Sequence, residues 1–292
     1  MTTSKKPLIQ SGWIRVCVFI VVLIFLYTVY GIVWNLADFI AADPGMNSGS
    51  GLPDQSSFYY GFLIQAAISV AAVILCRKII DRQPINTVGF SFPSYKPDAI
   101  AGFSLAIVLL GTGALILVLN RNLQWVDLYF DPLTLTLNFF LMALIAFSEE
   151  LVFRGYILSN LMSSFNRWLA LGISAFIFTL FHIQNPGIHF IAVLNLFTGG
   201  VLLGLNYVYT RNLWFAVLFH FAWNFFQGPV LGFKVSGLEP SSVLVQDLKG
   251  NRFLTGGEFG FEGSVLQTML MIILIIVLIV VYEKDPLRKP LL

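Results

Sequence analysis

The sequence has little charge, few histidines and almost no cysteine. Only 11% of its 292 residues are Asp, Glu, Lys or Arg, whereas 57% are hydrophobic, and the mean hydropathy is +0.82. This composition excludes a water-soluble globular protein, and it gives no basic surface that would bind nucleic acid. The two cysteines, Cys17 and Cys76, form no C-x-x-C pattern and lie far from the C-terminus. They therefore support neither a disulfide framework nor a lipidation signal.

Long apolar runs make up much of the sequence. Runs of about 20 residues, the length that crosses a bilayer, recur along the whole chain. We predict eight spans and hence an all-α polytopic membrane protein. The first run is too long for the core of a cleaved signal peptide, so we interpret it as a retained anchor. The predicted spans are residues 16–36, 58–75, 99–119, 133–161, 168–182, 188–209, 213–226 and 265–282.

Lys and Arg are unevenly divided between the two sides that eight spans define. Thirteen of the 17 fall on the side of the two termini, and the other four are Arg121, Lys234, Lys249 and Arg252. By the positive-inside rule, both termini then lie in the cytoplasm and the protein lies in the cell membrane. A small-residue pattern, Gly200-x-x-x-Gly204, predicts close approach of a neighbouring helix in the sixth span.

Three regions follow from this arrangement. Residues 1–131 form an N-terminal three-span region with a cytoplasmic linker, and residues 132–227 form a core of four spans. Residues 228–292 hold an extracytoplasmic loop and the last span. The loop is rich in glycine, and we expect it to be a solvated connection.

Two adjacent carboxylates and an arginine interrupt the apolar run of the fourth span. Ionisable side chains in a span are costly unless they pair or line a wet cavity, so they are functional candidates. Glu150 and Arg154 are four residues apart on one helical face, which suits an ion pair. Arg154 is equally explained as a cation close to the cytoplasm. Glu149 points about 100° away from Glu150, so it is not needed for this ion pair and can have another role.

Two further polar constellations lie in later spans. His182 ends a Phe-x-x-x-His pattern, and His220 and Asn224 lie one helical turn apart. At about 1.5 Å per residue, these groups and Glu149 lie at similar depths, about 14–25 Å from the cytoplasmic ends of their spans. By itself, His182 also fits an interfacial histidine next to a turn, and His220 with Asn224 also fits a hydrogen-bonding pair between helices. His189 matches no pattern and is interpreted as interfacial.

A carboxylate, two imidazoles and an amide in one dry site suit hydrolysis of an acyl bond. A glutamate can take the proton of a water that a histidine orients. An imidazole and an amide can stabilise the oxyanion that develops.

The three motifs, Glu-Glu-x-x-x-Arg at 149–154, Phe-x-x-x-His at 178–182 and His-x-x-x-Asn at 220–224, lie in this order on successive apolar segments. Together they resemble the CAAX protease and bacteriocin-processing (CPBP) family. This family of intramembrane endopeptidases includes the Ras-converting CAAX endopeptidase. The resemblance covers about residues 133–227 and makes the four-span core a catalytic core.

The resemblance implies a role for each residue. Glu149 would activate the water together with His182, and His220 and Asn224 would form the oxyanion site. Glu150 and Arg154 would be structural or substrate-facing. The implied activity is hydrolysis of a peptide bond in a membrane-bound or membrane-entering peptide within the lipid bilayer.

Metal dependence and function both have alternatives. Glu149, His182 and His220 offer three ligands for a zinc ion, but the chain lacks the H-E-x-x-H pattern. The family has been described both as metalloproteases and as metal-independent glutamate proteases, and we expect no cofactor. A non-catalytic member of the bacteriocin-immunity type is one functional alternative. A proton-coupled transporter is the other, although the chain lacks the two similar halves of many transporters.

Overall fold

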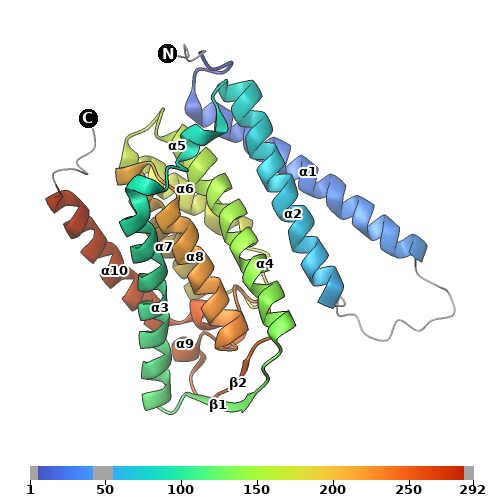
Figure 1. Ribbon diagram of the computed structural model, residues 1–292, viewed down its shortest axis with the longest axis vertical. Helices are drawn as coiled ribbons and strands as arrows, with labels where there is room; N and C mark the ends of the chain where they lie inside the picture. Colours follow the sequence, from blue (N-terminus) through green and yellow to red (C-terminus); the bar gives the residue numbers. More distant parts are fainter. Residues whose placement is uncertain (1–5, 42–54, 286–292) are drawn as a thin grey trace.

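The structure is a computed structural model, and it describes residues 6–41 and 55–285 (Figure 1). Helices dominate it, and the predicted all-α polytopic membrane fold is confirmed. Each predicted span coincides with a helical segment. Most of the predicted loop after the first span, and the terminal cations Lys5, Arg288 and Lys289, lie outside the described residues. The helices are α1 (Gly12–Ala41), α2 (Gln55–Cys76), α3 (Lys96–Leu119), α4 (Pro132–Glu150), α5 (Ser159–Leu161), α6 (Arg167–Phe181), α7 (Phe190–Thr210), α8 (Trp214–Phe225), α9 (Arg252–Thr255) and α10 (Val265–Lys284).

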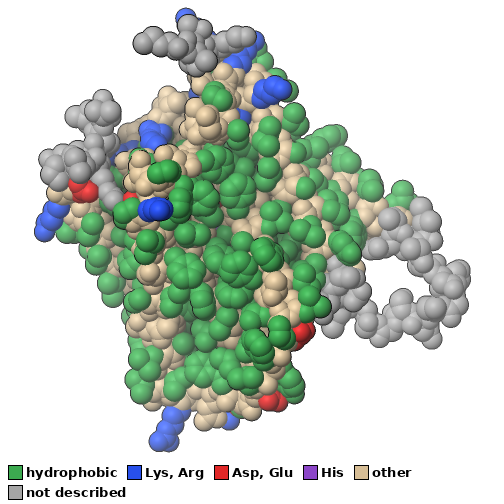
Figure 2. All heavy atoms as spheres, in the orientation of Figure 1, with side chains coloured by type: hydrophobic (Ala, Val, Ile, Leu, Met, Phe, Trp, Pro, Cys, Tyr) green, Lys and Arg blue, Asp and Glu red, His purple; other side chains and the backbone are tan. Residues whose placement is uncertain are grey.

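The arrangement is that of a multi-pass membrane protein. The first turn of α1 and the last turn of α10 lie toward one end of the molecule, and a β-ribbon lies toward the other (Figure 1). Hydrophobic side chains cover the middle of the face drawn in Figure 2, and charged side chains gather at its two ends. This is the pattern of a surface that meets lipid between two aqueous phases.

The prediction of eight full spans is corrected at two helices. In the described part of the chain, six helices are long and apolar enough to cross a bilayer. Helix α6 has 15 residues and α8 has 12, so they extend only about 22 Å and 18 Å, against a hydrocarbon core of about 30 Å. Helix α8 carries His220 and Asn224, and His182 directly follows α6.

Helix boundaries follow local signals in the sequence. Asp131 caps α4 by accepting a hydrogen bond from the Leu133 amide, and Pro132 occupies the first turn, where its missing N–H costs nothing. Asn166 caps α6 by accepting from the Leu169 amide at 3.0 Å. Arg211 adopts a left-handed conformation with φ 54° and ends α7.

The predicted close approach at Gly200 and Gly204 is present between α6 and α7. A Cβ atom at Gly200 would lie 2.9 Å from Ala175 Cα, and one at Gly204 would lie 2.5 Å from Leu171 Cδ1. Both neighbours belong to α6. The glycines therefore let the helix that precedes His182 pack directly against α7.

The fourth predicted span is helical throughout but not uniformly α-helical. After Glu150 the chain continues as a π-helix over Leu151–Leu158, whose eight residues are all buried, before α5 completes it. A second π-helical segment, Phe226–Val230, follows α8. Such widened turns are common next to functional sites. Here both follow segments that carry candidate site residues.

The expectation of a solvated loop between α8 and α10 is wrong. Part of it forms strand β2 (Leu244–Leu248), which pairs antiparallel with β1 (Leu123–Leu128). Phe233, Phe259 and Phe261 of this loop are at most 1% exposed. The Phe261 ring lies against Gly113 of α3. Aromatic side chains of this loop therefore pack inside the protein instead of facing solvent.

Candidate active site

A cavity of about 300 Å³ lies among the helices, and all four predicted catalytic side chains line it. Glu149 is the next-to-last residue of α4, and His182 directly follows α6. His220 and Asn224 come from α8. Side chains of α1, α2, α7, α10 and the loop between α8 and α10 complete the walls. The structure thus brings together residues that are up to 75 positions apart in the sequence.

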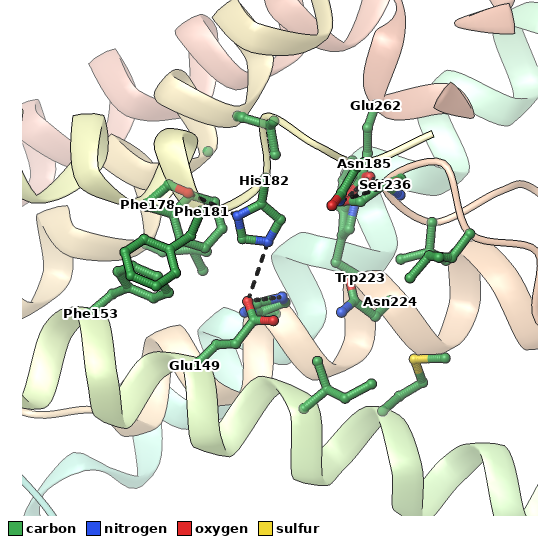
Figure 3. A pocket seen from close by; sticks show the side chains of 18 of the residues that line it. Glu149, Phe153, Phe178, Phe181, His182, Asn185, Trp223, Asn224, Ser236 and Glu262 are labelled. Carbon is green, nitrogen blue, oxygen red and sulfur yellow. Dashed lines mark hydrogen bonds and ion pairs between the residues drawn. The ribbon is translucent and has the colours of Figure 1, made fainter. Parts of the chain in front are cut away.

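Glu149 faces His182 (Figure 3), and it also lies close to His220. Its Oε2 atom lies 3.7 Å from His182 Nε2 and 3.9 Å from His220 Nε2. Among the described residues this oxygen has no hydrogen-bond partner. The Glu149 side chain is 27% exposed, whereas that of Glu150 is fully buried. Glu149 is therefore the carboxylate that the cavity can reach.

Both imidazole rings are held through their Nδ1 atoms. His182 Nδ1 lies 2.8 Å from the Phe178 carbonyl oxygen, which can only accept, so Nδ1 carries the proton. His220 Nδ1 lies 2.8 Å from Glu150 Oε1, which also accepts. These bonds fix the ring orientations and turn both Nε2 atoms toward Glu149.

Glu150 and Arg154 form the predicted ion pair. Arg154 Nη1 donates to Glu150 Oε1 at 2.7 Å, and both side chains are almost completely buried. Arg154 Nη2 donates to the Gly200 carbonyl oxygen at 3.0 Å, and the guanidinium lies 4.9 Å from the centre of the Phe178 ring. Pairing therefore explains Arg154 better than its closeness to the cytoplasm does.

The contact between Glu150 and His220 was not predicted. The two residues are 70 positions apart on α4 and α8, and no spacing pattern in the sequence connects them. His220 does form a hydrogen bond between helices, as one interpretation of the sequence proposed, but only through Nδ1. Asn224, which is 6% exposed, directs its amide nitrogen toward the cavity (Figure 3).

The chemistry of the two imidazoles and the Glu149 carboxylate suits zinc, but their spacing does not. Imidazole ligands of zinc commonly donate their other ring N–H to a carboxylate or carbonyl, as both rings do here. Two ligands bound tetrahedrally at zinc distances lie about 3.4 Å apart, and the distances of 3.7 and 3.9 Å exceed this. In the described ranges, no three His, Cys, Asp or Glu side chains are close enough to hold a metal ion. Metal independence remains a prediction.

Sequence reasoning missed several cavity residues. Glu262 and Ser236 belong to the loop that was expected to be solvated, and both line the cavity. Glu262 follows buried Phe261, and a carboxylate beside aromatic residues was the signal that could have revealed it. Tyr27 of α1, whose hydroxyl lies 2.6 Å from Ser69 Oγ, also lines the cavity. His189 is not among the lining residues, and its Nδ1 lies 3.3 Å from the Gly187 carbonyl oxygen.

The fold and the site together define a multi-pass membrane protein with a Glu–His–His–Asn cavity between its helices. Residues 131–226 match the family model described as "Rce1-like: Type II CAAX prenyl endopeptidase Rce1-like". The match spans about a third of the chain and contains all four candidate catalytic residues. It confirms the resemblance predicted from the three motifs and supports a peptidase at the level of the family. Comparisons with curated proteins and with solved structures gave no match.

The matched segment includes only part of the cavity. The walls from α1, α2, α10 and the loop between α8 and α10 lie outside residues 131–226. The division of the chain into three regions remains a prediction.

Proposed function

We propose that the protein is an intramembrane endopeptidase that hydrolyses a peptide bond of a membrane-associated peptide or protein without a metal ion. The observation that carries this proposal is the convergence of Glu149, His182 and His220 on one cavity, with both Nε2 atoms turned toward the carboxylate. Asn224 adds an amide donor on the same wall as His220.

The distances favour a water between Glu149 and the histidines. Separations of 3.7 and 3.9 Å are too long for direct hydrogen bonds, which are about 2.7–3.2 Å, so Glu149 Oε2 remains an acceptor for a water in the cavity. In the proposed reaction, one O–H of this water donates to Glu149 and the other to the His182 Nε2 lone pair. Glu149 takes the proton as the water oxygen attacks the carbonyl carbon.

His220 and Asn224 are the proposed oxyanion donors. His220 donates from Nε2 only as an imidazolium, and this cation would face Glu150 at Nδ1 and Glu149 at Nε2. The Asn224 amide supplies a second N–H. When the tetrahedral intermediate collapses, the C–N bond breaks and the proton held by Glu149 passes to the leaving amine. Donors fixed in advance in a water-poor site make the largest contribution to such reactions.

Glu150 and Arg154 act on this chemistry through His220. The ion pair fixes the carboxylate that holds His220 Nδ1, and the hydrogen bond to the Gly200 carbonyl anchors Arg154 to α7. Both are therefore positioning residues. The distribution of Lys and Arg further supports an orientation in the membrane with both termini in the cytoplasm.

Reconstituted protein in liposomes tests this function. A library of apolar peptides of about 20 residues, a length that spans a bilayer, is incubated in H₂¹⁸O and examined by mass spectrometry. Hydrolysis places one solvent oxygen in the new C-terminal carboxylate, and Glu149→Gln should form this product at least about 10²-fold more slowly. Proton flux that depends on Glu149, without any peptide cleavage, would identify a transporter instead. The absence of both activities would favour a non-catalytic binding protein.

A further inference from the structure

A second carboxylate, Glu262, lines the same cavity in different surroundings. It is 9% exposed. Its Oε1 accepts a hydrogen bond from Trp223 Nε1 at 2.9 Å. Its Oε2 accepts from the Ser236 amide at 2.6 Å and from the Ser236 hydroxyl at 2.7 Å. Three neutral donors thus hold the carboxylate in one orientation.

No cation neutralises Glu262 in the part of the chain that the structure describes. None of the ion pairs found there includes it. The lysine of the same loop, Lys234, pairs with exposed Glu258 at 2.8 Å, and this hydrogen bond raises the pKa of Lys234. Buried charges in membrane proteins normally pair or line a functional cavity. The Glu262 carboxylate is therefore available to pair with a cationic group that another molecule brings into the cavity.

A second acceptor lies in the same cavity. Gln267, in the first turn of α10, is 3% exposed and lines the cavity. Its Oε1 atom has no hydrogen-bond partner among the residues described. A buried acceptor without a donor is costly. The cavity thus holds two acceptors, the Glu262 carboxylate and the Gln267 carbonyl oxygen, that suit a ligand with a positive charge and several N–H donors.

The position of Glu262 relates it to the proposed chemistry. Figure 3 shows Glu262 beside Ser236 and Asn185, across the cavity from Glu149. Its partner Trp223 lies on α8 directly before Asn224. The hydrogen bond from the indole therefore holds Glu262 against the helix that carries both proposed oxyanion donors. A peptide whose scissile carbonyl lay at these donors would share the cavity with Glu262.

We propose that Glu262 and Gln267 form a subsite for a cationic group of the substrate, an ammonium or a guanidinium, close to the scissile bond. This inference rests on the proposed peptidase function. The cation comes either from a Lys or Arg side chain or from a free amino terminus. Glu262 and Gln267 both lie outside the segment that matches the family model, so the match does not imply this subsite.

Peptides of one sequence distinguish the two sources. An apolar Leu- and Ala-rich peptide that the protein cleaves is made with Lys, Arg, norleucine or Glu at each position around the cleaved bond, with a free or an acetylated N-terminus. We expect Lys or Arg at one position to raise kcat/KM at least about tenfold over norleucine, and Glu to lower it. If the cation is the amino terminus, acetylation causes the loss instead. Equal kcat/KM for all the peptides would overturn the subsite.

Variants assign the preference to the proposed residues. Glu262→Gln should bring the ratio of Lys to norleucine peptides close to one, and Gln267→Leu should lower it in part. Glu258→Gln is the matched control, because Glu258 is in the same loop but is 81% exposed, and it should leave the ratio unchanged. If Glu262→Gln does not accumulate as folded protein, the peptide series with the wild-type protein decides the question.

Binding separates this inference from the proposed function. Fluorescein-labelled Lys and norleucine peptides are titrated onto the Glu149→Gln protein, and their affinities are compared by anisotropy. Binding that is at least about tenfold tighter for the Lys peptide, with no cleavage by wild type, supports the subsite while the endopeptidase proposal fails. Cleavage of the Lys and norleucine peptides at equal kcat/KM supports the endopeptidase proposal and overturns the subsite. Equal binding without cleavage overturns both.

Discussion

Asp81 and Glu149 are both carboxylates within a membrane protein, but their partners differ. Asp81, which is fully buried, lies 3.4 Å from Arg15 Nη1 and 2.7 Å from Arg77 Nη1. The Tyr156 hydroxyl and the Asn160 amide, each at 3.3 Å, complete its surroundings. This cluster joins α1 and α2 to the segment that follows α4. Two cations and two neutral donors satisfy the carboxylate, which leaves it no capacity for another ligand.

Glu149 has no Lys or Arg partner in the part of the chain that the structure describes. It faces two histidines at distances longer than hydrogen bonds, and its buried Oε2 has no hydrogen-bond partner among the described residues. Its neighbour Glu150 resembles Asp81, because it is paired with Arg154 and hydrogen-bonded to His220. A carboxylate buried for structure is thus neutralised by an arginine, whereas a carboxylate kept for chemistry faces the cavity without a Lys or Arg partner in the described ranges.

The largest effect on turnover is expected at the unsaturated carboxylate. Glu149→Gln removes the proposed base, so cleavage should fall by about 10²–10⁴-fold. Thermal unfolding of the detergent-solubilised protein should change little, because Glu149 has no Lys or Arg partner in the described ranges. Steady-state cleavage and a melting curve measure the two quantities. Wild-type turnover in this variant would refute the mechanism.

Asn224→Ala is expected to have a smaller effect. Loss of one oxyanion donor typically costs about 10²–10³ in kcat, and KM should change less. Asparagine is not a usual zinc ligand, so the variant also separates the oxyanion role from metal binding.

We expect elemental analysis to find substoichiometric zinc in wild type, and chelators to leave its activity intact. Stoichiometric zinc that is lost together with activity would show that the enzyme depends on metal.

Asp81→Asn should affect stability but hardly affect turnover. Removing the carboxylate leaves Arg15 and Arg77 together without their counter-charge, a change that typically costs about 3–5 kcal/mol in a buried pair. A lower melting temperature with turnover retained per folded molecule is the expected result. Glu150→Gln is the informative comparison, because it strands Arg154 and also releases His220, so both quantities should fall. Loss of turnover without loss of stability in Asp81→Asn would show that Asp81 acts in catalysis and not only in structure.

Much of the fold was predictable because it depends on local properties. The length of an apolar run limits where a span can lie, and signals such as Asp131 followed by Pro132 set helix starts. The candidate site residues could be found for a related reason, since polar side chains inside apolar runs are costly and are rarely there by chance. The pairing of Glu150 with Arg154 needed only the helical repeat.

Other features depend on how segments far apart in the sequence pack. The glycine-rich loop after α8 has the composition of a solvated connection, but Phe233, Phe259 and Phe261 of this loop are buried in the folded protein. Glu262 enters the cavity only through that folding, and Trp223 reaches it from 39 positions away.

The sequence by itself determined the membrane class, the approximate spans, the Glu150–Arg154 pair and the four residues proposed for catalysis. Hydropathy, charge and helical spacing are sufficient for the first three, because each acts over a few turns of one helix, whereas the four residues were identified by the order of three motifs on successive spans. Only the tertiary structure decided which atoms of those residues face one another. The bond from His220 Nδ1 to Glu150 and that from His182 Nδ1 to the Phe178 carbonyl turn both rings toward Glu149. The rotation of a ring depends on the hydrogen-bond partner that packing brings beside it. For His220 that partner lies on another helix, which the periodicity of α8 does not encode.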